Sequence, residues 1–261
     1  MSIISNLTNK QIAGLSTTSM QQLTTTNVTE LTTTQVSALS ATQINAMEEE
    51  DLQAFTATQI TGFSTAAVKG LTAGAIAALT ETQTAALTTN QIAALTAYGI
   101  EALTETDVQG WDATQMGALT AKQLGSLTAT ALADFSTTQI TNLTSTQIHG
   151  FSATQLNSID AADLNAIDID DLYTSQVAGL SATTIASLTS TQAQAFTETQ
   201  IGSLSAAAIG AIASTDLQAW STTQLGAITA KQLGGLTTSA IANFSQAQLG
   251  GLTSTQLRGL T

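Results

Sequence analysis

The stretch Leu31-Thr32-Thr33-Thr34-Gln35-Val36-Ser37-Ala38 is the unit from which nearly the whole chain is repeated. The same eight-residue pattern returns directly in residues 39–46 and again in residues 143–150. In each octad, slot one is a large apolar residue, slot two is usually Thr or Ser, and slot five is usually Gln. Slot six is a second apolar residue, and slot eight is small. A fixed period of this kind is typical of repeat architectures.

Neither a continuous helix nor a simple strand fits a period of eight. An α-helix turns by about 100° per residue, so its apolar stripe would drift by roughly 80° with every octad. In a strand, slots one and six would point to opposite faces. Thr at slot two and Gln at slot five instead match the S/T-x-x-E/Q capping box, with slots one and six at the positions of the hydrophobic staple. The pattern therefore predicts one helix of one to two turns in each octad.

Helices this short are not stable alone, so the apolar residues must be buried by stacking against neighbouring units. The predicted fold class is an all-α repeat protein, a solenoid or superhelix of short helices with one helix per octad. Thr, Val and Ile also favour strands, which leaves a β-solenoid as the alternative.

A longer repeat overlies the octads. The segment 151–159 repeats 39–47 fourteen octads later, whereas Trp220 follows Trp111 at three residues less than that offset. The three missing residues fall in 167–171, where one octad has only five residues. We predict a single continuous solenoid over residues 1–261, built from a partial copy (1–38), a full copy (39–150) and a copy shortened by three residues (151–261).

Composition excludes several classes of partner. The formal net charge is −13 with only five Lys and Arg, so the chain lacks the basic surface that binds nucleic acid or an anionic membrane. There is no cysteine for disulfides or thiolate metal sites. No apolar run approaches the roughly 20 residues of a membrane span, which predicts no membrane insertion. The first ten residues contain no apolar segment, so we expect no N-terminal signal peptide in this chain.

The strongest candidate for a metal site surrounds the shortened octad. Carboxylate oxygens at short spacing can bind calcium, and five aspartates are crowded there: Asp160, Asp163, Asp168, Asp170 and Asp171. The competing interpretation is structural, because most of these residues occupy slot two or slot five, where they would cap helices. The glycine of an EF-hand loop is absent. We expect no cofactor other than this calcium.

The remaining candidates have plain structural interpretations. His149 is the only histidine and is interpreted as a solvent-facing side chain, because it has no second histidine or nucleophile motif beside it. Tyr98 and Tyr173 lie outside the core slots and are expected to be exposed. The other aromatics occupy slot one and are interpreted as core residues rather than as a sugar-stacking platform: Phe55, Phe63, Trp111, Phe135, Phe151, Phe196, Trp220 and Phe244.

Threonine recurs at slot four, where a regular solenoid would arrange it as a row on the surface. Examples are Thr26, Thr34, Thr42, Thr58, Thr138, Thr146 and Thr154. Such a row can simply be a solubilising face with few charges. The functional alternative is a surface that binds ice or carries O-glycans.

The units 31–38, 39–46 and 143–150 resemble the short tandem repeat tracts of very large bacterial secreted or surface proteins, which are adhesin-like. The resemblance implies an extracellular or cell-surface location and a structural or adhesive role. It brings no catalytic residues with it, and we predict that the protein is not an enzyme.

Taken together, these patterns predict a non-enzymatic structural repeat protein: a rod-like spacer, a stalk or the subunit of a self-assembling filament. The alternative is a binding module, an adhesin whose Thr-rich face binds a glycan, ice or a protein surface. Met1 falls in slot three and Thr261 in slot two, so copies placed head to tail would continue the register. We therefore expect head-to-tail self-association.

Overall fold

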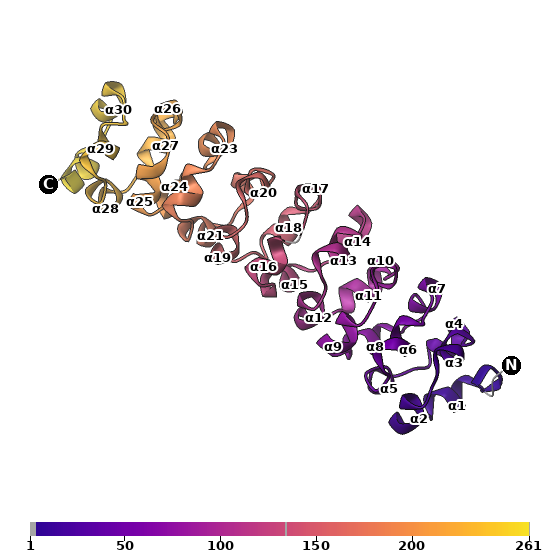
Figure 1. Cartoon of the computed structure of the whole chain (residues 1–261). Helices are drawn as coiled ribbons and strands as arrows, with labels where there is room; N and C mark the ends of the chain where they lie inside the picture. Colours follow the sequence, from indigo (N-terminus) through magenta and orange to yellow (C-terminus); the bar gives the residue numbers. More distant parts are fainter. Residues whose placement is uncertain (1–3, 134, 261) are drawn as a thin grey trace. The chain divides into compact units, whose positions relative to one another are not determined.

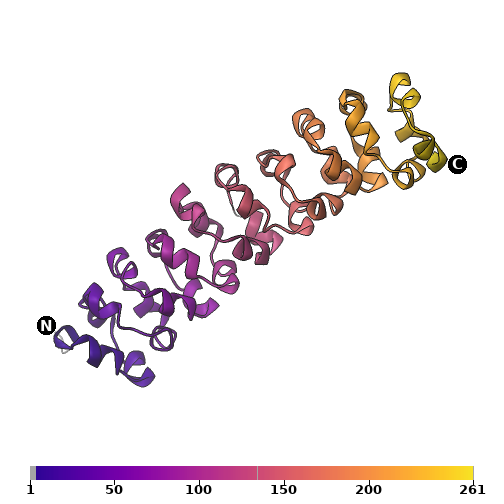
Figure 2. The same ribbon diagram turned by 180° about the vertical axis from the view of Figure 1, so that it is seen from behind.

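A computed structural model describes residues 4–133 and 135–260, and these residues form short helices and no strand (Figures 1 and 2). Each α-helix has four to six residues, as the octad predicts. The prediction of an all-α solenoid is confirmed. The β-solenoid alternative is wrong for the described residues, because capping side chains at slots two and five hold these Thr- and Ile-rich segments in helical turns.

The chain divides into two compact units, residues 1–143 and 144–261. We describe each unit by itself, and the single continuous array over 1–261 stays a prediction. The helices of the first unit are η1 (Ile4–Asn6), α1 (Asn9–Ala13), α2 (Thr17–Gln21), α3 (Thr25–Thr29), α4 (Thr33–Val36), α5 (Ala41–Ile44), α6 (Glu49–Gln53), α7 (Ala57–Ile60), α8 (Thr65–Lys69), α9 (Ala73–Ala77), α10 (Glu81–Ala85), α11 (Thr89–Ala94), α12 (Ala97–Glu101), α13 (Glu105–Gln109), α14 (Ala113–Gly117), α15 (Ala121–Ser126), α16 (Ala129–Ala133) and α17 (Thr137–Thr141).

The second unit continues the same pattern, with one short 3₁₀-helix in place of an α-helix at the shortened octad. Its helices are α18 (Ser145–Ile148), α19 (Ala153–Leu156), α20 (Ala161–Asn165), η2 (Ile169–Asp171), α21 (Thr174–Ala178), α22 (Ala182–Ala186), α23 (Ser190–Ala195), α24 (Glu198–Ser203), α25 (Ala206–Ala211), α26 (Ser214–Ala219), α27 (Thr222–Gly226), α28 (Ala230–Gly234), α29 (Thr238–Ile241), α30 (Gln246–Gly250), α31 (Ser254–Leu257) and η3 (Arg258–Leu260).

Helix α4 shows how an octad folds. Thr32 is extended, with φ −74° and ψ 155°, and its hydroxyl oxygen accepts the backbone N–H of Gln35 at 3.2 Å. The Gln35 side-chain oxygen accepts the backbone N–H of Thr32 at 2.8 Å, which completes the capping box. Leu31 and Val36, the two residues of the staple, are both buried. The local prediction of cap and staple is confirmed.

Each turn of the coil contains three octads. In the first unit, helices three steps apart pack together, as α4 does on α7 and α7 on α10 (Figure 1). In the second unit, α22 packs on α25 and α25 on α28 in the same way. In a regular region, residues that share a slot and are separated by three octads therefore lie in one column of stacked helices.

The slot-five glutamines join successive turns. The side-chain N–H groups of Gln59 donate to the carbonyls of Val28 at 2.8 Å and of Leu31 at 2.7 Å. In the second unit, Gln232 donates to the carbonyls of Ile201 and Leu204, both at 2.7 Å. The amide thus caps its own helix with its oxygen and binds two carbonyls of the previous turn with its nitrogen, using both of its polar atoms. We call this contact the glutamine bridge.

Each of the two tryptophans forms a hydrogen bond to the backbone of the previous turn. The indole N–H of Trp111 donates to the carbonyl of Thr84 at 3.1 Å, and that of Trp220 donates to the carbonyl of Ala193 at 2.9 Å. Both acceptors stand at slot six, where most octads carry Ile, Leu or Val. In the second unit, the large indole of Trp220 therefore lies one turn after Ala193, where slot six carries an unusually small side chain.

The shortened octad still fills one side of the coil. Helix η2 packs against α23, and α19 packs against α21, so η2 occupies a full position between α20 and α21. Gln176 donates to Ile148 and Phe151, which precede it by 28 and 25 positions. The corresponding separations for Gln59 are 31 and 28. The glutamine bridge is therefore retained across a turn that is three residues shorter than the others.

Candidate functional site

The five aspartates near the shortened octad are distributed over two elements, α20 and η2, each with its N-cap residue. Asp160 is the N-cap of α20, and its carboxylate accepts the backbone N–H of Asp163 at 2.8 Å. Asp168 is the N-cap of η2 without a side-chain cap hydrogen bond, and Asp170 is exposed. Across residues 4–133 and 135–260, no three His, Cys, Asp or Glu side chains form a group that could hold a metal ion. The calcium hypothesis thus has no ligand group to support it.

Asp171 and the only histidine come together at this break. The hydroxyl of Ser145 donates to the Asp171 carboxylate at 2.5 Å. Nε2 of His149 lies 2.6 Å from the Asp171 carbonyl oxygen, so this nitrogen carries a proton. The His149 ring stacks on Tyr173 with ring centroids 3.7 Å apart. The interpretation of His149 as a mere solvent-facing side chain is wrong, because both of its partners belong to the following turn of the coil.

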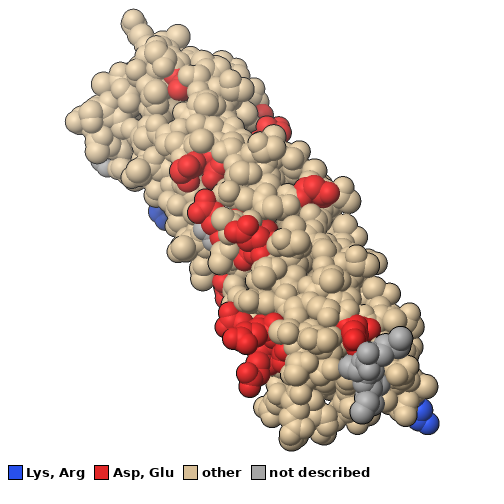
Figure 3. All heavy atoms as spheres, turned by 45° about the vertical axis from the view of Figure 1, so that its right-hand side comes forward, with Lys and Arg blue, Asp and Glu red and all other residues tan. Residues whose placement is uncertain are grey.

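A second acidic run, Glu48–Asp51, begins α6 in the first unit. Asp51 is buried at slot five, where other octads place their bridging glutamine. Burial raises the pKa of the Asp51 carboxyl above its ordinary value of 3.8, and the neighbouring charges of Glu48 and Glu50 raise it further. Acidic side chains greatly outnumber basic ones on the face seen in Figure 3. The run Glu48–Asp51 therefore forms a negatively charged surface in which the ionised form of Asp51 is disfavoured.

The aromatic residues at slot one are core residues, as predicted. Phe55 and Phe63 pack edge to face with centroids 5.1 Å apart. All of the aromatics predicted for the core are buried: Phe55, Phe63, Trp111, Phe135, Phe151, Phe196, Trp220 and Phe244. Tyr98 and Tyr173 are 75% and 55% exposed, which confirms the expectation for both. A sugar-stacking platform cannot be built from the buried set.

The predicted slot-four threonines are all exposed, and the coil aligns a subset of them. In the first unit, one hydroxyl stands on each of five successive turns, at intervals of three octads: Thr34, Thr58, Thr82, Thr106 and Thr130. In the second unit, the stacked helices α19, α21, α24 and α27 carry an equivalent series: Thr154, Ser175, Thr199 and Thr223. We call each series a threonine column. The octad pattern predicted a surface row of slot-four threonines. Because each turn contains three octads, only the threonines of every third octad belong to one row.

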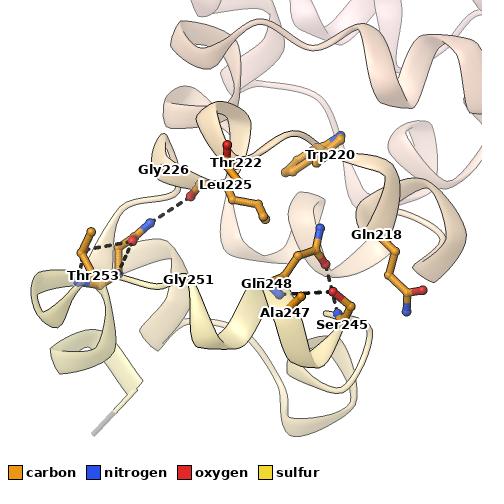
Figure 4. A pocket seen from close by; sticks show the side chains of 11 residues that line it. Gln218, Trp220, Thr222, Leu225, Gly226, Ser245, Ala247, Gln248, Gly251 and Thr253 are labelled. Carbon is orange, nitrogen blue, oxygen red and sulfur yellow. Dashed lines mark hydrogen bonds between the residues drawn. The ribbon is translucent and has the colours of Figure 1, made fainter.

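A hollow of about 390 Å³ opens beside Trp220 in the second unit (Figure 4). Two of the glutamines around it already have protein partners. Gln248 donates to the carbonyl of Leu217 at 2.9 Å, and Gln256 donates to those of Leu225 and Ile228. The hollow is a space between turns that glutamine bridges surround.

Comparison with known proteins finds a match to a repeat family in two segments of the chain. Residues 44–81 and 209–246 match the ALTTAQ repeat family, one segment in each compact unit. The six letters correspond to slots eight and one to five of the octad, as in residues 86–91. No curated protein matches the chain. The chain is a tandem repeat protein, and among the described residues no helix has the length and apolar character needed to cross a bilayer.

Proposed function

We propose that this protein is a non-enzymatic structural repeat protein, a solenoid that acts as a spacer or stalk at the cell surface or outside the cell. The glutamine bridge is the observation that carries the proposal. Gln59, Gln91 and Gln123 repeat the same pair of hydrogen bonds to the previous turn, each at 2.7–2.9 Å. An array built in this way gains length by adding turns, without any new kind of contact.

The chemistry of the core supports a mechanical role. Most bridging amides, including those of Gln59, Gln91 and Gln123, are buried and connect a helix start to two carbonyls of the neighbouring turn, so sliding or bending of one turn would leave buried polar groups without partners. The apolar residues of slots one and six are buried in most octads and form the core. This combination resists bending while leaving a weakly charged, hydroxyl-rich surface.

The spacer proposal is tested by changing the number of turns in the full chain. Duplication of residues 55–78 adds one full turn of three octads and keeps every column in register. We expect the maximum dimension in small-angle X-ray scattering to increase by about 8–10 Å, the spacing of packed helices, with thermal stability maintained. An unchanged dimension would refute the proposal.

A matched control duplicates only residues 71–78. This insertion shifts the columns by one third of a turn, so that helices on its two sides meet partners of the wrong size. We expect this variant to lose stability while the full-turn duplication does not.

The location is a separate part of the proposal and rests on the resemblance to repeat tracts of bacterial surface proteins. Its test is antibody labelling of intact cells that produce the protein. Labelling without permeabilisation supports an external location, and labelling only after permeabilisation contradicts it.

Self-assembly into a filament extends the same proposal, because the contact that joins one turn to the next could also join two copies head to tail. Electron microscopy over a series of protein concentrations is the test. Fibres whose length increases with concentration support assembly, and particles of constant size contradict it.

The threonine columns favour one alternative function, a binding module that engages ice, a glycan or a protein through its hydroxyl-rich face. Five exposed threonines on successive turns of the first unit support it. Ice is the simplest probe: the protein should concentrate in growing ice, and Thr82→Glu with Thr106→Glu should abolish this. Exclusion of the unmodified protein from ice would remove ice as the ligand.

A further inference from the structure

Both units contain a hollow at the same place in the repeat. In the first unit, a hollow of about 570 Å³ lies among α8, the connection between α11 and α12, and α15. In the second unit, a hollow of about 480 Å³ lies among α21, the connection between α24 and α25, and α28. Thr120 and Lys122 of the first correspond to Thr229 and Lys231 of the second, with the same offset that relates the two tryptophans. The long duplication has therefore copied the hollow.

The two copies differ most in two large side chains. Tyr98 and Lys69 line the first hollow, whereas the equivalent residues in the second unit are Ala207 and Ala178. The first hollow thus combines two lysines with one tyrosine, and the second has one lysine. The second copy also shows that the repeat accommodates alanine at both positions.

The basic residues of the first unit are concentrated at this hollow. Residues 1–143 contain three lysines and no arginine, and Lys69 and Lys122 both line the hollow. Both are exposed, no Asp or Glu belongs to the lining, and neither lysine forms an ion pair with a described residue. Two unpaired ammonium groups on an otherwise acidic protein favour a ligand that carries a negative charge.

Thr96 adds two further donors to the lining. In α4, the Gln35 oxygen accepts both the backbone N–H of Thr32 and its hydroxyl. In α12, slot five is Gly99, so of the side-chain hydrogen bonds of a capping box Thr96 keeps only the one that its hydroxyl oxygen accepts from the backbone N–H of Gly99 at 3.2 Å. Among the described residues, the backbone N–H and the hydroxyl proton of Thr96 have no acceptor.

Tyr98 determines the shape of the ligand. It stands at slot four and exposes 75% of its surface, more than any other large apolar side chain in the described chain. An exposed ring beside hydroxyl groups suits a ligand with one apolar face and polar edges, and a pyranose has this form. The volume is within the usual range of ligand sites, roughly 300–1,000 Å³.

We propose that this hollow binds a sugar residue that carries a carboxylate, as in a uronic acid of an otherwise neutral glycan. The ring stacks on Tyr98, while Lys69, Lys122 and Thr96 donate to the carboxylate and ring oxygens. A densely charged polyanion is disfavoured by the eleven Asp and Glu residues of the same unit. The inference does not depend on the spacer function.

The test is a titration of the full chain with methyl β-D-glucuronide, followed by saturation-transfer NMR. Methyl β-D-glucoside, which lacks only the carboxylate, is the matched ligand control. We expect saturable binding of the glucuronide and at least about tenfold weaker binding of the glucoside. No binding of the glucuronide, or equal binding of both sugars, would overturn the proposal. Inorganic phosphate that displaces the glucuronide at equal concentration would also overturn it, because the site would then recognise any anion.

Variants separate this site from the rest of the surface. Tyr98→Ala combined with Lys69→Ala should reduce affinity by about tenfold or more without unfolding, since the second unit carries alanine at both equivalent positions. In that background, Ala207→Tyr with Ala178→Lys should restore one saturable site in the second unit. Undiminished binding by the first variant, or no recovery in the second, would contradict the assignment.

Discussion

A regular turn and the turn that contains the shortened octad close the coil with different numbers of residues. In the regular turn, Gln232 reaches the carbonyls of Ile201 and Leu204, 31 and 28 residues earlier, both at 2.7 Å. Across the break, Gln176 reaches Ile148 and Phe151, 28 and 25 residues earlier, at 2.9 and 2.8 Å. The acceptors are again the slot-six and slot-one carbonyls of the previous turn. The two endpoints of the bridge are therefore the essential feature, and the number of residues between them can change.

The break also carries contacts of its own. A 3₁₀-helix of three residues, η2, replaces an α-helix. Its last residue, Asp171, accepts hydrogen bonds from Ser145 in α18 and from His149, the C-cap of that helix. His149 in turn stacks on Tyr173. These side chains connect η2 to the previous turn, so the shortened octad combines the general bridge with a local cluster.

The largest expected effect comes from removing the bridge on each side of the comparison. Gln232→Ala and Gln176→Ala each remove the side-chain donor to two carbonyls of the previous turn and leave one backbone N–H, that of Thr229 or Tyr173, without its acceptor. We expect a loss of about 3 kcal/mol in unfolding free energy for either variant, measured by urea denaturation. Equal losses of unfolding free energy would show that the regular turn and the shortened turn depend on the same bridge. A much smaller loss for Gln176→Ala would show that the shortened turn does not depend on it. The control is Gln218→Ala, an exposed side chain with one hydrogen bond to the Asn243 carbonyl.

Packing in a regular turn is expected to have the next largest effect. Ala193→Leu places a larger side chain against Trp220 and should cost about 2 kcal/mol through overpacking. Trp220→Leu in the same chain should recover part of that loss, since the small residue is there to accommodate the indole. The measurement is a double-mutant cycle, and strict additivity of the two losses would contradict the pairing.

His149→Ala tests the local cluster at the break. The variant loses the hydrogen bond to the Asp171 carbonyl and the ring stack, for which we expect about 1 kcal/mol. Backbone hydrogen exchange should accelerate in η2 more than in α23. Thr141→Ala, at the same slot of a regular octad, is the control and should change stability by less than about 0.5 kcal/mol. Uniform acceleration along the second unit would show that the cluster has no local role.

The sequence predicts those features whose partners are close in the chain. Thr32, Gln35 and Val36 lie within one octad, so their spacing alone indicates the cap and the staple. The glutamine bridge and the tryptophan hydrogen bonds join positions that are between 27 and 31 apart in regular turns, so predicting them requires knowing that a turn has three octads. One signal was present: Thr84 precedes Trp111 by the same distance at which Ala193 precedes Trp220.

The candidate sites show the same contrast between features formed within one octad and features formed between turns. Crowding of aspartates in the sequence suggested calcium ligands, but short helices direct neighbouring side chains to different partners, as for Asp160 and Asp171. The duplicated hollows draw their residues from three turns. Lys69 and Lys122 are separated by more than six octads, a distance at which the octad alone does not indicate contact with the same space.

The smallest expected effect concerns slot five itself, where the buried Asp51 replaces the bridging glutamine. The folded state raises the pKa of Asp51, so it binds a proton more tightly than the unfolded chain, and stability falls as pH rises from 3.8 through the raised pKa. Asp51→Asn removes this penalty. The stability gained by the variant should be near zero below pH 3.8, increase above it and then reach a plateau, as measured by urea denaturation across the acidic range up to neutral pH. Glu49→Gln, an exposed neighbour in the same run, is the control for general charge. A gain that is independent of pH would show that the carboxylate of Asp51 is not penalised by burial, and that slot five tolerates a charge as readily as it accepts glutamine.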